Sequence, residues 1–112
     1  MTTAKLISFS FKRGQVPKDM PVVDCRSLRN PHSRPTLRDL TGLDADVQTY
    51  VRNDPHRLTL LKQARQHLDE KNAVAFGCYG GRHRSVAMAE MLAVALRHEG
   101  LAVEVEHRAL AS

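Results

Sequence analysis

The sequence predicts a small α/β domain with a mostly parallel sheet and flanking helices. Three observations support this fold class. A continuous apolar run at residues 73–76 indicates a buried strand, a helical pattern follows from Arg84 to Glu99, and residues 101–106 alternate as a last strand. A strand, a helix and a strand in this order form a βαβ unit, so the two strands are expected to be parallel.

Two further strands are predicted near the start of the chain. Residues 5–11 alternate, with Ile7, Phe9 and Phe11 on one side, which predicts a strand with one buried face. The segment 22–24 begins with two valines and ends with an aspartate, which indicates a short second strand.

The helix boundaries are marked by capping residues. Asp44 is expected to cap a short helix, and Asp54, which precedes a proline, indicates a second helix start. Gly100 is expected to close the last helix as a left-handed cap. The second helix is expected to carry Leu58, Leu61, Ala64, Arg65 and Leu68 at helical spacing.

Length and composition limit the class of protein. The chain has 112 residues, of which 42% are hydrophobic, so we expect one domain over residues 1–112 with one core. No apolar run is long enough to span a bilayer and no signal-peptide core follows the N-terminus, which predicts a cytoplasmic protein without a membrane partner. Cys25 and Cys78 are the only cysteines, and a reducing compartment would keep them as thiols. No Cys/His spacing fits a zinc site, and no cofactor is implied.

The net charge of +5 favours anionic partners such as phosphates, nucleotides or nucleic acid, although a solvated basic surface would have the same charge. Aromatic residues make up only 4% of the chain and tryptophan is absent. This composition argues against a surface for single-stranded nucleic acid, which needs exposed rings for base stacking.

The segment 77–85 carries the strongest functional signal. It joins a buried strand to a helix, at the carboxyl end of the strand, where ligands of open α/β sheets bind. Its three glycines allow a sharp turn with inward-facing N–H groups, and the following helix adds unpaired N–H donors and a positive dipole end. Three basic side chains and a serine follow, and all these features favour a tetrahedral dianion. The alternative is a glycine-rich turn with incidental arginines.

Two kinds of enzyme, P-loop nucleotide hydrolases and cysteine-dependent phosphatases, also bind phosphate with a loop of this kind. A Walker A motif requires a lysine that is absent here, so ATP hydrolysis has no support. Cys78 and Arg84, followed by Ser85, have the Cys-x5-Arg-Ser spacing of cysteine-dependent phosphatases, in which a thiolate attacks phosphorus. Gly77 replaces the histidine that usually precedes the cysteine, and only Asp24 and Asp39 are candidates for a general acid. We therefore expect no catalytic residue, with Cys78 and Arg84 as the alternative.

The irregular stretch 26–42 is the second candidate region, because long segments without a periodic pattern in small domains are often functional. Asp24 leaves the short strand before it and could contact a sugar, although an ion pair with Arg26 or Arg38 would also explain it. Asn30 and His32 flank a proline that would fix the direction of their side chains. The candidate ligand-binding residues are Asp24, Asn30, His32, Cys78, Tyr79, Gly80, Gly81, Arg82, His83, Arg84 and Ser85.

Several ordered motifs resemble the C-terminal domain of the RNase adapter protein RapZ family. The stretch 8–14 resembles the opening strand of the family. The stretch 23–32 resembles its Asp-x-Arg-x-Leu-x-Asn-Pro-His segment, which 37–44 continues. The stretch 77–86 resembles its Gly-Cys-Thr-Gly-Gly-x-His-Arg-Ser-Val loop, and 107–108 its closing His-Arg. Together the motifs span nearly the whole chain.

The resemblance implies a fold similar to a phosphofructokinase subdomain and a bacterial regulatory adapter. It also implies binding of glucosamine-6-phosphate and of small regulatory RNA, with RNase E as a protein partner. A homo-oligomer is a further way in which so small a chain could act.

Three departures from the family bear on these expectations. Members carry an N-terminal P-loop kinase-like domain that this sequence lacks, so we expect a stand-alone version of the C-terminal domain. RNA-binding members end in a tail rich in lysine and arginine, whereas this chain ends Arg108-Ala109-Leu110-Ala111-Ser112. Sugar-phosphate binding is therefore better supported than RNA binding. Tyr79 replaces the usual threonine, which removes a compact hydroxyl and could alter which ligand fits.

Overall fold

The computed structural model describes residues 3–110, which form a four-stranded parallel sheet with the strand order β2-β3-β1-β4. The strands are β1 (Ala4–Ser10), β2 (Val22–Asp24), β3 (Ala73–Cys78) and β4 (Val103–His107). The predicted α/β class with a parallel sheet is confirmed.

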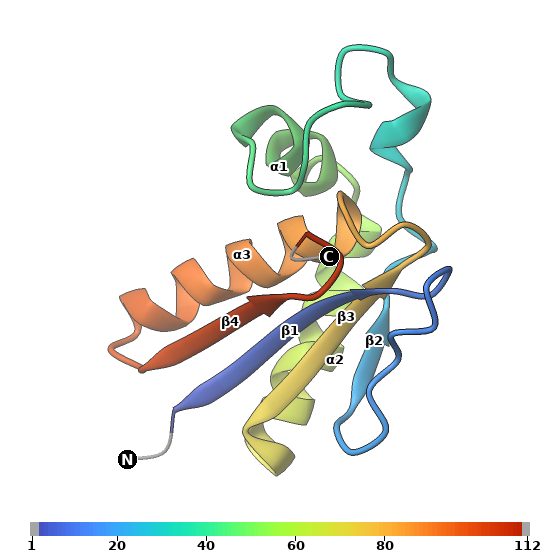
Figure 1. Ribbon diagram of the computed structural model, residues 1–112. Coiled ribbons are helices and arrows are strands. Elements are labelled where there is room, and N and C mark those ends of the chain that lie inside the picture. The colour runs from blue at the N-terminus through green and yellow to red at the C-terminus, as the bar shows by residue number, and fades with distance from the viewer. Residues whose placement is uncertain (1–2, 111–112) are drawn as a thin grey trace.

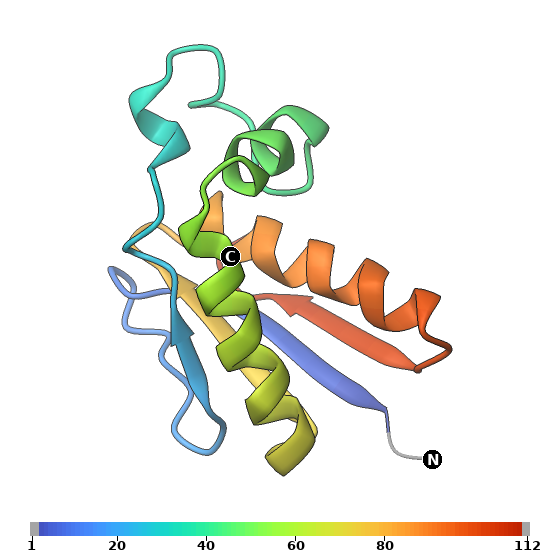
Figure 2. The same ribbon diagram turned by 180° about the vertical axis from the view of Figure 1, so that it is seen from behind.

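Three α-helices and one short 3-10 helix accompany the sheet. The α-helices are α1 (Ala45–Arg52), α2 (His56–Lys71) and α3 (Arg84–His98), and the 3-10 helix η1 covers Pro31–Ser33. Helices α2 and α3 cover the same face of the sheet, as the view from behind shows (Figure 2). Helix α1 lies beside the start of α3, beyond the ends of the strands (Figure 1).

The strand pairing confirms the predicted parallel relation of β3 and β4, but the two strands are not neighbours. Strand β1 lies between them and pairs with both: Ser10 aligns with Cys78 of β3, and Ser8 aligns with His107 of β4. Helix α3 therefore crosses over β1, and the carboxyl ends of all strands lie at one edge of the sheet.

The prediction of one buried face for the first strand was wrong, because β1 is a central strand and both of its faces are covered. Leu6 packs into the main core beneath α2 and α3. Ile7 and Phe9 pack on the opposite face against Phe11 and Met20, which lie in the connection between β1 and β2. Strand β4 is an outermost strand of the sheet, and it retains the alternating pattern of burial.

The predicted helix boundaries are confirmed, with two differences in detail. Leu58 is 58% exposed, and Leu60 instead packs in the core with Ala64. Asp44 is the N-cap residue of α1, as predicted, but its side chain accepts a hydrogen bond from the Thr41 N–H (2.8 Å), outside the helix, and makes no capping bond. Gly100 follows α3 with φ +88°, as predicted for a left-handed cap.

The edge of the sheet at the carboxyl strand ends is where distant segments meet. The segment 25–44 extends beyond this edge, and the turn after β4 reaches the loop between β3 and α3 (Figure 1). This edge therefore holds both of the regions that carry the predicted site. None of the helices in residues 3–110 is long and apolar enough to cross a membrane.

Candidate ligand-binding site

The loop between β3 and α3 forms one wall of a pocket of about 420 Å³. The start of η1 forms a second wall, and Lys12, which follows β1, contributes to the rim. The pocket is lined by Lys12, Asn30, His32, Cys78, Tyr79, Gly80, Gly81, Arg82, His83 and Arg84. Nine of the eleven predicted site residues are thus brought together, and Asp24 and Ser85 lie outside the lining.

The first half of the loop is fixed to the end of β1. The carbonyl oxygen of Tyr79 accepts hydrogen bonds from the Lys12 N–H (3.0 Å) and the Ser10 hydroxyl (2.8 Å). At Gly81 the backbone is left-handed (φ +72°), and a Cβ atom there would lie 2.7 Å from Ala109 Cβ and 2.8 Å from Ser10 N. Only glycine allows this close approach of the loop to Ser10 and Ala109.

The second half of the loop presents free backbone donors. Within residues 3–110, the N–H groups of residues 80–83 donate no hydrogen bond, and these residues directly precede the first turn of α3. Unpaired N–H groups at a helix N-terminus carry partial positive charge and attract anions. The loop therefore offers unpaired backbone donors where the anion cradle is predicted.

Arg84 has a different role in the structure from a free phosphate ligand. Its Nη1 donates hydrogen bonds to the carbonyl oxygens of Arg26 (2.9 Å) and Leu28 (3.1 Å), and the residue is only 6% exposed. Its Nε has no partner among the described residues. Arg84 thus fastens the 26–28 segment to the start of α3 and shapes the pocket wall.

Ser85 and Cys78 form a buried pair beneath the loop. The Cys78 Sγ lies 3.1 Å from the Ser85 hydroxyl and accepts the Ser85 N–H at 3.4 Å. Ser85 is fully buried and Cys78 is 2% exposed. Cys25 lies in the same core cluster, and burial raises the pKa of its thiol well above the ordinary range. The sulfur and hydroxyl of the loop therefore stabilise each other.

The histidines of the two walls approach each other across the pocket. The ring centroids of His32 and His83 are 6.3 Å apart. Burial lowers the pKa of His83, although the backbone carbonyls of Leu40 and Arg38 act in the opposite direction. Its Nε2 is buried and has no hydrogen-bond partner within the described part of the chain.

Asn30 positions η1. Its side-chain oxygen accepts the His32 N–H at 3.1 Å and so caps the short helix. This bond helps to place His32 at the pocket. It also occupies the side-chain oxygen of Asn30.

Asp24 forms an ion pair with Arg26 on the surface. Arg26 Nη2 lies 2.7 Å from Asp24 Oδ2, and Arg26 Nε donates to the same carboxylate. The hydrogen bonds from Arg26 lower the pKa of Asp24. This arrangement corresponds to the loop-fastening alternative for Asp24, and the carboxylate would have to leave Arg26 to contact a ligand.

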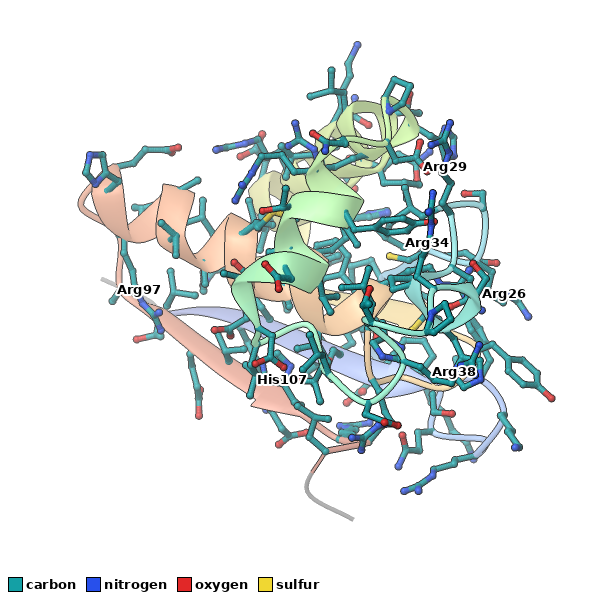
Figure 3. All side chains as sticks on the ribbon, turned by 90° about the horizontal axis from the view of Figure 1, so that it is seen from above. Arg26, Arg29, Arg34, Arg38, Arg97 and His107 are labelled. Carbon is teal, nitrogen blue, oxygen red and sulfur yellow. The ribbon has the colours of Figure 1, made fainter. Side chains whose placement is uncertain are left out.

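Four arginines of the segment 26–38 lie close to one another. Arg26, Arg29, Arg34 and Arg38 lie at the same end of the molecule, whereas Arg97 lies far from them (Figure 3). Arg26 stacks over the Phe11 ring at 3.8 Å, and Arg38 Nε donates to the His32 carbonyl at 2.9 Å. These contacts hold positive charge close to the pocket.

Lys12 is the pocket residue that sequence reasoning missed. It lies in the stretch 8–14 that carried the family resemblance, directly after a predicted strand. Its position at the carboxyl end of a central strand is the signal that could have found it. The described residues contain no group of three or more His, Cys, Asp or Glu residues that could hold a metal ion.

Comparison with known proteins decides the family. The sequence matches the family model of the RapZ C-terminal domain over residues 2–111. The chain belongs to the RapZ C-terminal domain family. The match covers the sheet, the helices and both walls of the pocket, so the resemblance of the sequence motifs is confirmed over nearly the whole chain.

Relatives of this family support the assignment. The chain is 44% identical over 117 residues to a nucleotide-binding protein of Ruegeria sp., covering 94% of this chain and 39% of the relative. It is also 44% identical over 121 residues to a nucleotide-binding protein of Rhizorhabdus wittichii, covering 97% of this chain and 38% of the relative. The RapZ C-terminal domain described here thus spans about two fifths of the length of these curated relatives.

Proposed function

We propose that this chain is a binding module for a phosphorylated small molecule, either a sugar phosphate or a nucleotide, without chemistry of its own. The observation that carries the proposal is the row of N–H groups at residues 80–83 that have no partner within residues 3–110, on a loop that lines a pocket together with Lys12, Arg82 and Arg84. Backbone donors at a helix start bind phosphate without the reorganisation that a flexible side chain would need.

The two walls of the pocket would bind different parts of the ligand. Phosphate is held by the amides of residues 80–82, with the exposed Arg82 adding charge, while His32 meets the rest of the ligand or a phosphate oxygen. Arg84 and Ser85 contribute indirectly, because their hydrogen bonds hold the loops in place. The pocket volume of about 420 Å³ suits a ligand of this size.

The names of the relatives bear on the ligand class. The relatives in Ruegeria sp. and Rhizorhabdus wittichii are described as nucleotide-binding proteins, and each is much longer than this chain. Nucleotides therefore belong among the candidate ligands of this pocket beside sugar phosphates.

Titration calorimetry tests the proposal directly. We expect inorganic phosphate, glucosamine-6-phosphate and adenosine monophosphate to bind, and unphosphorylated glucosamine not to bind. Arg82→Ala should weaken all phosphorylated ligands because it removes positive charge at the cradle. Arg97→Ala, which removes the same charge far from the pocket, is the matched control. If no phosphorylated compound binds, the proposal is wrong.

The role of Asp24 can be decided in the same assay. In the ligand-contact role, Asp24 exchanges Arg26 for the sugar, so Asp24→Ala weakens glucosamine-6-phosphate and leaves inorganic phosphate unchanged. In the loop-fastening role, the substitution changes both affinities by the same small factor, because an exposed ion pair contributes little.

RNA binding is a second candidate, favoured by the four arginines at one end of the molecule. Such binding would be weak, indifferent to sequence and steeply dependent on salt. A gel shift with a small RNA at low salt tests it, with a quadruple variant of Arg26, Arg29, Arg34 and Arg38 to alanine as comparison. The absence of a complex at low salt would remove this candidate.

A further inference from the structure

Tyr79 is unusual among the aromatic residues of this chain. The sequence contains three phenylalanines and two tyrosines, and no tryptophan. Phe9 and Phe76 are fully buried, and Phe11 and Tyr50 are partly buried, whereas Tyr79 is 56% exposed. The ring therefore contributes little to the core, and its place in the pocket lining requires another explanation.

The backbone of Tyr79 is nevertheless held firmly. Its carbonyl oxygen accepts the Ser10 hydroxyl and the Lys12 N–H, and the neighbouring Cys78 carbonyl accepts the Phe11 N–H at 3.0 Å. An exposed ring on a fixed backbone loses little conformational entropy when a ligand packs against it.

The position of the ring relative to the cradle defines what it can contact. Tyr79 directly precedes Gly80, at which the row of free N–H groups begins. The Lys12 ammonium lies 5.8 Å from the centre of the Tyr79 ring, so an aromatic surface and a second cation adjoin the phosphate position. A ligand held by its phosphate would therefore place its next group against this ring.

We propose that the Tyr79 ring is a stacking platform for a nucleobase, so that the pocket selects nucleoside phosphates over simple sugar phosphates. This inference rests on the proposed phosphate-binding function. Every nucleobase has a planar π face, and stacking between a base and an aromatic side chain is sequence-tolerant. Lys12 lies near the same ring, where it also attracts the phosphate.

Adenosine monophosphate and ribose 5-phosphate are matched probes, because they share the sugar and the phosphate and differ in the base. Stacking on one ring corresponds to an affinity gain of about 5- to 150-fold. Wild-type protein should therefore bind adenosine monophosphate more tightly than ribose 5-phosphate by a factor in this range. Tyr79→Ser should reduce the ratio to near one, and Tyr79→Phe, which keeps the ring, should preserve it.

Intrinsic fluorescence provides a second readout that depends on the ring itself. Tyr50 and Tyr79 are the only tyrosines, and no tryptophan masks their emission. In a Tyr50→Phe variant, Tyr79 is the sole reporter, and a base stacked on it should quench the emission while ribose 5-phosphate should not. The Tyr79→Ser variant, in which only Tyr50 emits, corrects for light absorbed by the base.

The outcomes separate the two proposals. If inorganic phosphate and ribose 5-phosphate bind, and adenosine monophosphate binds no more tightly and does not quench Tyr79, the base platform is wrong while phosphate binding stands. If Tyr79→Ser weakens ribose 5-phosphate and adenosine monophosphate equally, the ring packs against the sugar, and the nucleobase assignment is wrong. If none of the three compounds binds, both proposals are wrong.

Discussion

The guanidinium of Arg84 lies against the carbonyl oxygen of Leu28, to which Nη1 donates a hydrogen bond at 3.1 Å across a sequence separation of 56 residues. The same atom donates to the carbonyl of Arg26 at 2.9 Å. One side chain thus connects the start of α3 to the segment that leads into η1. Arg84, which the sequence suggested as a ligand-binding residue, therefore links the two walls of the pocket.

Replacing Arg84 should destabilise the fold as well as the site. Arg84→Ala leaves both carbonyls without this partner, and hydrogen bonds from a charged donor contribute about 1.5–3 kcal/mol to stability. We expect a loss of this size in the free energy of unfolding, measured by urea denaturation. Arg97→Ala is the control, because Arg97 is exposed and donates to the Val103 carbonyl at 3.0 Å. A loss of phosphate affinity with no loss of stability would mean instead that Arg84 turns into the pocket.

Gly81 should be intolerant of any side chain. Gly81→Ala forces an alanine into the left-handed conformation, which costs about 1–2 kcal/mol, and also drives its Cβ against Ser10 and Ala109. We expect a loss of more than about 2 kcal/mol in the free energy of unfolding.

Two other glycines separate the causes of this loss. At Gly100, φ is +88° and an added Cβ meets nothing within 4 Å, so Gly100→Ala measures the conformational cost alone. At Gly80 a Cβ also meets nothing, and Gly80→Ala should change stability by less than about 0.5 kcal/mol. Similar losses at Gly81 and Gly100 would show that the contact with Ser10 and Ala109 relaxes at little cost.

Asp54 should make part of the stability dependent on pH. Its carboxylate accepts the Arg29 N–H (2.9 Å) and the His56 N–H (3.0 Å), and the Arg29 bond is the main cause of its lowered pKa. A carboxyl group with a lowered pKa in the folded state stabilises the protein above its ordinary pKa of 3.8. This stabilisation is lost as the pH falls below 3.8, through the lower pKa of the folded state.

Asp54→Asn tests this dependence. Asparagine keeps one of the two acceptor oxygens, so the variant should lose about 0.5–1.5 kcal/mol at pH 7, the contribution of one hydrogen bond, and its stability should fall less steeply with acid. Urea denaturation between pH 7 and pH 3 measures both effects. Asp19→Asn, at an exposed position, is the control. Parallel stability curves for the wild type and Asp54→Asn would contradict the prediction.

The sequence predicted the features of this fold that depend on local pattern. The apolar run 73–76, the glycine-rich loop and the helix after it are contiguous, so both the parallel crossover and the place of the pocket followed from neighbouring residues. The double burial of β1 did not follow, because a strand becomes central only through the order of strands in the sheet. That order depends on contacts far apart in the chain.

The same limit applies to the side chains of the site, because their directions depend on contacts between distant segments. The backbone donors of the 80–83 loop were predictable because a glycine-rich turn directly before a helix start leaves N–H groups without a backbone partner. The direction of Arg84 was not, because a long side chain can reach either a ligand or the carbonyls of a segment that only the tertiary fold brings near. Lys12 was missed because its segment meets the loop only through the pairing of β1 with β3, which the local sequence does not reveal.

Cys78 should not act as a phosphatase nucleophile. A cysteine-dependent phosphatase needs a guanidinium that holds the phosphoryl oxygens while the thiolate attacks. Here the guanidinium of Arg84 is bonded to the carbonyls of Arg26 and Leu28, and the Cys78 sulfur is buried beside Ser85. We therefore expect no turnover of an aryl phosphate such as p-nitrophenyl phosphate.

The Cys78→Ser variant makes this expectation decisive. Serine keeps a polar atom beside Ser85, so the variant should retain the loop and bind inorganic phosphate with an affinity close to that of the wild type. A steady-state assay over pH 5–8 compares release of p-nitrophenol by the two proteins, with Cys25→Ser as the control for the other buried thiol. Multiple turnover by the wild type and by Cys25→Ser, lost in Cys78→Ser, would show that Arg84 leaves the carbonyls to hold the phosphoryl group. The binding module would then be an enzyme.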